Sequence, residues 1–261
     1  MSEQPFSLAE LMIAAAAQSW RDDGEIMGTG IGPLARIAVG VCKTLYNPAL
    51  ATTDGECWYT TEPLGPGQSS TDVEIEGWIP YERVFTSLWG GRRHAMVAPV
   101  QMDRFGQTNI SVIGDHKQPK SAMLGARGFP GNTASHPNSF LFTQHSKRSF
   151  VQGEVDFVCS AGFNPDRFEG RVPAWLDLRR IVTNLAVMDF GGENHAIRVV
   201  SLHSGVTFDE VQDNTGFDLA RAETVTITAA PTAPELDAIA KVDIHNVRSK
   251  ALKDNPPGLR G

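Results

Sequence analysis

Three glycines at alternate positions, Gly28, Gly30 and Gly32, stand directly before Pro33 and an apolar segment that runs to Leu45. Proline is favoured at the first position of a helix, and the apolar residues after it recur at helical spacing. The sequence therefore predicts a short strand, a loop and a buried helix. Such a loop offers backbone N–H groups and a positive helix end to a phosphate or a developing oxyanion. A tight turn that only lets the helix pack on its sheet fits the same residues.

The candidate N–H donors of this loop are five consecutive residues, Gly28, Thr29, Gly30, Ile31 and Gly32. Their spacing, G-x-G-x-G, differs from the dinucleotide-binding pattern G-x-G-x-x-G, and no acidic residue closes a second strand at the expected distance. The loop is therefore not predicted to bind a dinucleotide, and a phosphate site, an oxyanion site and a tight turn stay open.

A second candidate group lies in a glycine-rich loop around Arg127. The guanidinium of Arg127 could pair with a substrate carboxylate or a coenzyme phosphate, or it could be solvated. Asn132 and His136 follow in the same loop, and His136 could titrate near neutral pH or serve as a structural histidine. Further along, His145 with Lys147 and Arg148 forms a small basic cluster that either touches phosphates or lies on a solvated face.

Other polar residues are interpreted as structural supports. Asp103 and Arg104 precede Phe105 and Gly106 and are predicted to close a turn with an ion pair, and Asn109 is expected to bond loop backbone. His195 and His203 lie in strand-like surroundings and are expected in the core or at an interface.

Composition narrows the class of protein. The chain has 261 residues, a formal charge of -7 and a pI near 5.5, which argues against a general nucleic-acid binder. The three cysteines, Cys42, Cys57 and Cys159, are far apart and lack metal-ligand spacing, so neither a disulfide framework nor a zinc site is predicted. No signal peptide or membrane span is indicated. We expect a cytoplasmic location, no membrane or nucleic-acid partner and no metal.

Local patterns predict the elements that position these residues. Ser7 and Glu10 form a capping box for an amphipathic first helix ending near Trp20, and two further boxes begin at Thr207 and Thr232. A helix is predicted over 80–88 and irregular chain over 63–70. Strands are predicted over 49–53, 95–100, 139–143, 155–159, 181–190 and 197–202. This alternation predicts a single α/β domain over 1–261 with a parallel sheet, in which 246–261 is a polar tail that is mobile or held by a partner.

Three longer phrases carry a family resemblance: residues 101–111, 145–151 and 200–211. Together with the glycine loop they resemble the β subunit of family I coenzyme A transferases, in consistent order over residues 8–219. The resemblance implies an open, mostly parallel sheet flanked by helices, the CoA-transferase (NagB/RpiA-like) fold. It also implies an α subunit of the same family, a site between the two subunits and an α2β2 assembly. Coenzyme A would enter as part of the substrate, with no tightly bound cofactor.

Members of that family use a glutamate of the β subunit as nucleophile, and the corresponding position here is Asp54. Its carboxylate is one methylene shorter, and a misplacement of that size can cost about a hundredfold in rate. Glu56, two residues on, is a possible substitute or a solvated edge residue. Asp54 itself is either a site carboxylate or a turn residue before Gly55.

The run from Thr53 to Glu56, together with residues 127–136, resembles the hydrolase branch of this family, which cleaves a carbon–carbon bond of a steroid ring. That resemblance implies a ring-opening hydrolase subunit in which a glutamate of the α subunit is the acid or base and Asp54 positions water or substrate. Two alternatives stay open: a transferase in which Asp54 or Glu56 forms a covalent acyl intermediate, and a structural subunit that only completes its partner.

Overall fold

The structure, a computed structural model, describes residues 5–55, 57–123, 125–126 and 128–259. The chain divides into two compact units, one formed by residues 1–97 with 228–261 and the other by residues 98–227. The single-domain organisation stays a prediction. Among the described helices, none combines the length and the apolar character needed to cross a membrane.

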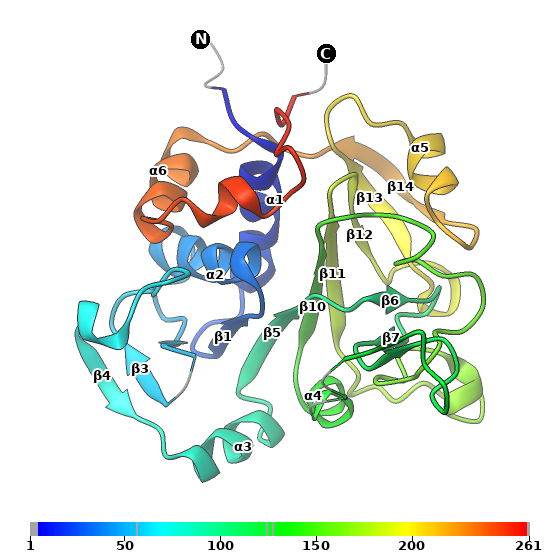
Figure 1. Cartoon of the computed structure of the whole chain (residues 1–261), viewed down its shortest axis with the longest axis horizontal. Helices are drawn as coiled ribbons and strands as arrows, with labels where there is room; N and C mark the ends of the chain where they lie inside the picture. Colours follow the sequence, from blue (N-terminus) through cyan, green and yellow to red (C-terminus); the bar gives the residue numbers. More distant parts are fainter. Residues whose placement is uncertain (1–4, 56, 124, 127, 260–261) are drawn as a thin grey trace. The chain divides into compact units, whose positions relative to one another are not determined.

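The first unit begins with helix α1, Leu8–Ala17, which continues into a 3-10 turn, Gln18–Trp20. Ser7 and Glu10 form the predicted capping box, since the Ser7 hydroxyl accepts from the Glu10 N–H and the Glu10 carboxylate accepts from the Ser7 N–H. The predicted amphipathic character is wrong. Nearly every residue of α1 is buried, because helices α2 (Pro33–Leu45) and α6 (Ala233–Val242) pack against it (Figure 1).

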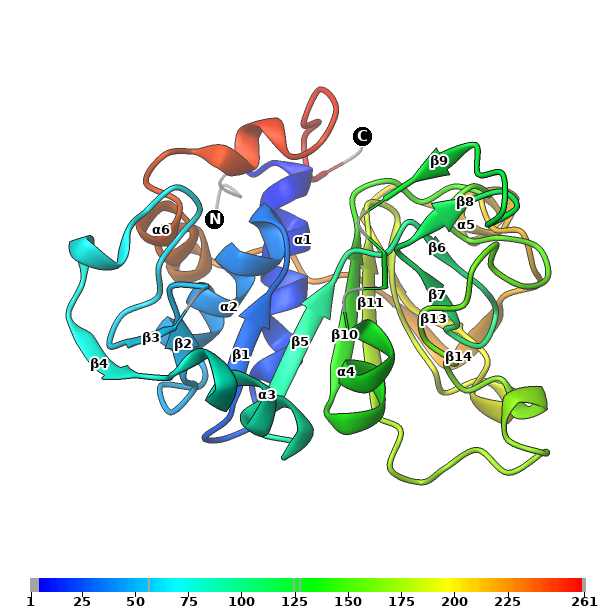
Figure 2. The same ribbon diagram turned by 60° about the horizontal axis from the view of Figure 1, so that its bottom comes forward.

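Two parallel strands lie beside these helices. Strand β1, Met27–Gly30, pairs with β5, Arg93–Val97, so that Gly30 lies opposite Met96, and the two strands run side by side in Figure 2. Between them in sequence comes a small antiparallel sheet in the order β2 (Thr52–Thr53), β3 (Trp58–Thr60), β4 (Ile75–Trp78). Helix α3, Tyr81–Trp89, follows β4 and lies close to the prediction.

The tail is held by this chain itself. Within the 3-10 turn Val247–Lys250, the Arg248 guanidinium donates to the Glu10 and Asp243 carboxylates at 3.0 Å each. The Leu8 N–H donates to the Pro256 carbonyl at 2.8 Å. Within the described range to residue 259, the C-terminal segment therefore packs on the start of the chain, and the expectation of a mobile or partner-held tail is corrected.

The second unit contains five strands in the order β10 (Asn138–Phe142), β11 (Leu178–Thr183), β12 (Ala186–Asp189), β13 (Arg198–Leu202), β14 (Ala220–Ile227). The outer pairs, β10 with β11 and β13 with β14, are parallel, whereas β11, β12 and β13 form antiparallel hairpins. Together with β1 and β5, the pairings described for these longer strands are mixed, three parallel and two antiparallel, and so mostly parallel as the resemblance implied.

Shorter elements complete this unit. Two small hairpins join β6 (Gln101–Met102) to β7 (Thr108–Asn109) and β8 (Val112–Ile113) to β9 (Ser121–Ala122). Helices α4 (Phe129–Ser135) and α5 (Phe208–Asp213) are short, and 3-10 turns occur at Pro165–Arg167 and Glu193–His195.

Two strand predictions in this unit are wrong. Residues 181–190 form parts of two strands joined by a turn, because the Thr183 hydroxyl accepts from the N–H groups of Leu185 and Ala186 and reverses the chain. Residues 155–159 are irregular, and only the neighbouring Ser160 makes a bridge, to Thr108. Alternating apolar residues there fill the core without a partner strand alongside.

Candidate active site

The glycine segment is mostly strand and only briefly a loop. Strand β1 continues through Gly30, which leaves Ile31 and Gly32 as the turn before α2. The Gly28 N–H donates to the Ala51 carbonyl at 3.0 Å, and the Ile31 N–H donates to the Met96 carbonyl at 2.9 Å. Both N–H groups already donate to backbone carbonyls of the same unit, so their predicted role as oxyanion donors is corrected.

Close packing explains two of the glycines. A Cβ on Gly30 would lie 2.2 Å from the Ala35 backbone, where α2 crosses the end of the strand, and a Cβ on Gly28 would lie 2.8 Å from Leu50. Gly32 has a φ of 102°, which favours glycine. The interpretation as a tight turn for helix packing is therefore supported by Gly30 and Gly32, whereas Gly28 leaves room for the Leu50 side chain.

Asp54 closes the hairpin between β2 and β3. Its N–H donates to the Trp58 carbonyl at 3.1 Å, and its carboxylate Oδ1 accepts from the Trp58 N–H at 3.1 Å. Gly55, with a φ of 93°, makes the turn that the Asp-Gly pair predicted. The half-buried Asp54 carboxylate is therefore held at a defined position on the hairpin. Glu56 lies outside the described residues.

Arg36, which was not predicted as a site residue, connects the glycine segment to Asp54. From the first turn of α2, its Nε donates to the Leu64 carbonyl at 2.8 Å and its Nη2 donates to the Asp54 carbonyl at 3.2 Å. Burial lowers the pKa of the Arg36 guanidinium from its ordinary value, and the charge of Asp54 opposes this shift. Its position three residues after Pro33 places it over the glycines, a spacing that could have indicated it.

A small cavity of about 50 Å³ lies between the glycine strand, Arg36 and the hairpin. Its walls come from the glycine strand, the start of α2 and the end of β2, and include Gly28, Thr29, Gly30, Arg36, Thr52, Thr53 and Gly55. The Thr29 hydroxyl accepts from Arg93 Nε at 3.0 Å, and burial lowers the pKa of Arg93 to about 10. The carboxyl end of β1 and Arg36 therefore lie beside the hairpin that carries Asp54, whereas Arg93 pairs with Met27 at the start of β1.

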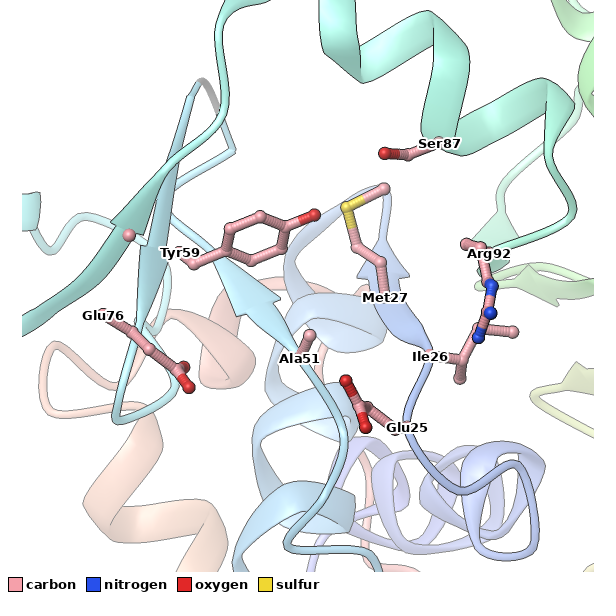
Figure 3. Close-up of a pocket in the computed structure, with 9 residues that line it drawn as sticks. Glu25, Ile26, Met27, Ala51, Tyr59, Glu76, Ser87 and Arg92 are labelled. Atoms are coloured by element: carbon pink, nitrogen blue, oxygen red, sulfur yellow. The ribbon is translucent and has the colours of Figure 1, made fainter.

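A larger cavity of about 500 Å³ lies elsewhere in this unit. It opens where β1 begins and is lined by Glu25, Met27, Tyr59, Glu76, Ser87 and Arg92 among others (Figure 3). The Tyr59 hydroxyl and the Met27 side chain point toward each other within it. Of the predicted site residues that the structure describes, none lines this cavity, so size alone does not locate the predicted site.

The remaining candidates lie in the second unit, around the short helix α4. Asn132 is half-buried, and its carbonyl accepts from the His136 N–H at 3.3 Å. His136 is buried, with Nδ1 2.9 Å from the Pro137 carbonyl, which fits the structural interpretation. Arg127 lies outside the described residues. The described candidates therefore belong to two units.

The predicted basic cluster is corrected. Lys147 and Arg148 are exposed, but His145 is buried between the hydroxyls of Thr183 and Thr215, at 3.1 and 2.9 Å. Its ring stacks on Phe150 with centroids 4.1 Å apart. Burial lowers the pKa of His145 to about 3, so the side chain is neutral and structural.

The structural supports differ in part from prediction. The Asp103 carboxylate accepts from the N–H groups of Phe105 and Gln107 at 3.0 and 2.9 Å and from the Gln107 amide. Arg104 instead lies over the Phe105 ring. Backbone donors therefore close this turn in place of the predicted ion pair. Asn109 accepts from the Ser111 N–H at 2.9 Å, which confirms its role.

The two later histidines behave differently from each other. His203 is buried, with Nε2 2.8 Å from the Thr183 carbonyl, as predicted. His195 does not lie in the core, since it is exposed in a 3-10 turn with a φ of 62° and stacks on Phe163. Its place at an interface stays a prediction. Glycines at 191 and 192 carry the chain out of β12 before this residue.

Two of the three cysteines, Cys42 and Cys159, are buried. Burial raises the pKa of the Cys42 thiol to about 12 and also raises that of Cys159, so neither is an activated thiolate. Over the part of the chain that the structure describes, no group of three or more His, Cys, Asp or Glu side chains could hold a metal ion.

The fold matches solved structures over nearly its whole length. The glutaconate coenzyme A-transferase of Acidaminococcus fermentans superposes with a TM-score of 0.78 at 18% identity, covering 93% of this chain and 96% of that one. The fold is therefore that of the coenzyme A transferases. The Rhodococcus jostii RHA1 IpdAB structure superposes with a TM-score of 0.88 at 36% identity, covering 95% of this chain and 99% of that one. No family model matches the chain.

Sequence relatives agree with this fold. The cholesterol ring-cleaving hydrolase IpdB subunit of Mycobacterium tuberculosis (strain ATCC 25618 / H37Rv) is 37% identical over 248 residues, 94% of this chain and 98% of the relative. One of the subunits of the 3-oxoadipate CoA-transferase of Pseudomonas knackmussii is 31% identical over 91% of this chain and 94% of the relative. The chain therefore belongs to the coenzyme A-transferase family, in the group that contains the IpdB subunits, and it is an enzyme subunit.

Proposed function

We propose that this chain is the β subunit of an αβ hydrolase that cleaves a carbon–carbon bond in a cyclic ketone carried as a coenzyme A thioester during steroid ring degradation. The observation that carries the proposal is the 37% identity to the cholesterol ring-cleaving hydrolase IpdB subunit, over 94% of this chain. An α subunit, an α2β2 assembly, a cytoplasmic location and the absence of a tightly bound cofactor belong to the same proposal.

The chemistry is a hydrolytic retro-Claisen cleavage. The oxygen of water attacks the ring ketone, and the bond from the former ketone carbon to its neighbour breaks. The electron pair passes to that neighbour as an enolate, which a carbonyl stabilises and a proton quenches. The former ketone becomes a carboxylate, so one water is consumed. A glutamate of the α subunit takes the proton from water, and such general base catalysis contributes about 10²–10⁴-fold.

Asp54 orients the attacking water or the ketone. Its position supports this role, because the hairpin and the Trp58 N–H hold the carboxylate in place and Arg36 ties the same turn to α2. Glu56 is the second carboxylate of this proposal. Arg127, Asn132 and His136 are proposed to contact the coenzyme A portion.

The glycine segment supplies fewer donors than its length suggests. The N–H groups of Met27 and Ile31 both donate toward the β5 side. Because N–H groups alternate along a strand, that of Thr29 faces β5 as well. The proposed oxyanion contacts therefore narrow to Gly30 and Gly32, where the removal of one donor typically costs about 10²–10³-fold.

The αβ complex provides the test. Turnover of a steroid-derived ring-keto thioester in ¹⁸O-water should place one heavy oxygen in the new carboxylate, and borohydride should trap no adduct on this chain. Absence of ring opening by the complete αβ complex would contradict the proposal, as would a trapped adduct at Asp54 or Glu56.

A coenzyme A transferase is the alternative, and the 31% identity to the 3-oxoadipate CoA-transferase chain favours it. In that case the carboxylate of Asp54 or Glu56 attacks the thioester, forms an acyl anhydride and then holds coenzyme A as a thioester. Transfer of coenzyme A to an added carboxylate, with the trapped adduct on this chain, would identify this activity.

A further inference from the structure

Asp54 is the first of three residues that lie in a row across the small sheet. Thr53 pairs with Tyr59, and the hydrogen bonds between Asp54 and Trp58 extend that register by one step. Trp58 in turn pairs with Trp78. Directly paired residues on neighbouring strands project from the same face of a sheet. The carboxylate and the two indoles therefore share one face.

The two indoles form an exposed apolar platform. Trp58 is 37% exposed and Trp78 is 62% exposed. Their ring centroids lie 6.4 Å apart, with an angle of 41° between the planes. Large aromatic groups are costly to leave in water, and adjacent exposed ones typically mark a binding surface. Trp58, the first residue of this platform, also donates its N–H to the Asp54 carboxylate.

The spacing of the row selects the part of the ligand that the platform contacts. Neighbouring paired residues are about 5 Å apart in an antiparallel sheet, so the indoles lie one and two such steps from Asp54. If Asp54 orients the ketone or its water, these steps reach the hydrocarbon ring attached to that ketone. The adenine of coenzyme A is separated from the thioester by the whole pantetheine arm. A fused hydrocarbon ring also matches an apolar platform that has one polar end.

We propose that Trp58 and Trp78 bind the apolar ring portion of the thioester and thereby set the preference for cyclic over short acyl groups. The inference rests on the proposed function, because it takes Asp54 as a site carboxylate. Trp58 makes the nearer contact and Trp78 extends it.

Binding to the αβ complex tests this inference, with Asp54→Asn present throughout to stop turnover. Two probes are compared: a steroid-derived ring-keto coenzyme A thioester and butyryl-CoA. Trp58→Ala should weaken binding of the ring-bearing thioester by about tenfold to a hundredfold, the range for loss of a large aromatic contact. Binding of butyryl-CoA should change by less than about twofold. Trp58→Phe, which keeps an aromatic face, should restore most of the affinity.

Trp175→Ala is the matched control, because Trp175 is 59% exposed and lies in the second unit. It should leave both affinities unchanged. Equal weakening of both probes by Trp58→Ala, or no weakening of either, would overturn the inference. Loss of αβ assembly in Trp58→Ala and Trp58→Phe would overturn it too, and would assign the platform to the α subunit. Failure of the ring-bearing thioester to bind the complex with native tryptophans would count against the proposed function instead.

Discussion

Two polar regions of this chain both lie in stretches typical of the family but differ in burial. Around Asp54, the carboxylate lies half-buried on a hairpin beside an exposed aromatic platform. Around His145, the imidazole is enclosed by two threonine hydroxyls and a phenyl ring. Both belong to stretches that carry the family resemblance. Polar residues typical of a family can therefore support its fold as well as its chemistry, and burial separates the two roles.

The largest expected effect tests the exposed side of this comparison. Asp54→Asn keeps the Oδ1 acceptor for the Trp58 N–H but removes the charge that orients the water or the ketone, so turnover of the ring-keto thioester should fall by about a hundredfold through lost near-attack geometry. Assembly with the α subunit, measured by size-exclusion chromatography, should be unchanged. Full activity in a normally assembled complex would favour the structural-subunit alternative.

His145 tests the buried side through pH. Its folded pKa of about 3 lies below the ordinary value of 6.5, so the unfolded chain binds a proton more readily between these values. Stability should therefore fall as pH drops below 6.5, by roughly 3 kcal/mol at pH 4 from this residue alone. Urea unfolding of the native chain and of His145→Gln should show a smaller loss in the variant. His116→Gln, at an exposed histidine, is the control and should keep the native pH dependence.

Gly30 tests whether the glycine segment is built for packing. An alanine Cβ there would lie 2.2 Å from the Ala35 backbone, so α2 must shift, and Gly30→Ala should cost about 2 kcal/mol of unfolding free energy. Gly77→Ala is the control, because nothing lies within 4 Å of its Cβ position. That change should stay within about 0.5 kcal/mol. Equal stability losses for the two variants would remove the packing explanation.

Local sequence patterns predicted only part of this site. The spacing of Gly32, Pro33 and the apolar residues after them predicted a turn into a buried helix, because proline and glycine preferences are local. The hydrogen bond from the Gly28 N–H to the Ala51 carbonyl was not predictable in this way, since a strand predicted over 49–53 does not say which neighbour that strand pairs with. The row from Asp54 to Trp78 also depends on the register of strands only two to four residues long.

Arg36 gives the smallest and most specific effect, because it acts on Asp54 through the backbone. Its guanidinium bonds the carbonyls of Asp54 and Leu64 and so ties the hairpin to α2. Arg36→Gln should lower turnover about tenfold by displacing the carboxylate, a modest misplacement on the scale at which 1 Å can cost about a hundredfold. Arg36→Lys, which keeps a cationic donor on a long side chain but loses the guanidinium fork, should recover part of the loss. Arg83→Gln, at an exposed position of α3, should leave turnover unchanged.

The double variant of Arg36→Gln and Asp54→Asn tests whether Arg36 acts through Asp54. A double variant that turns over no more slowly than Asp54→Asn alone would show that it does. Additive losses in the double variant would contradict this role.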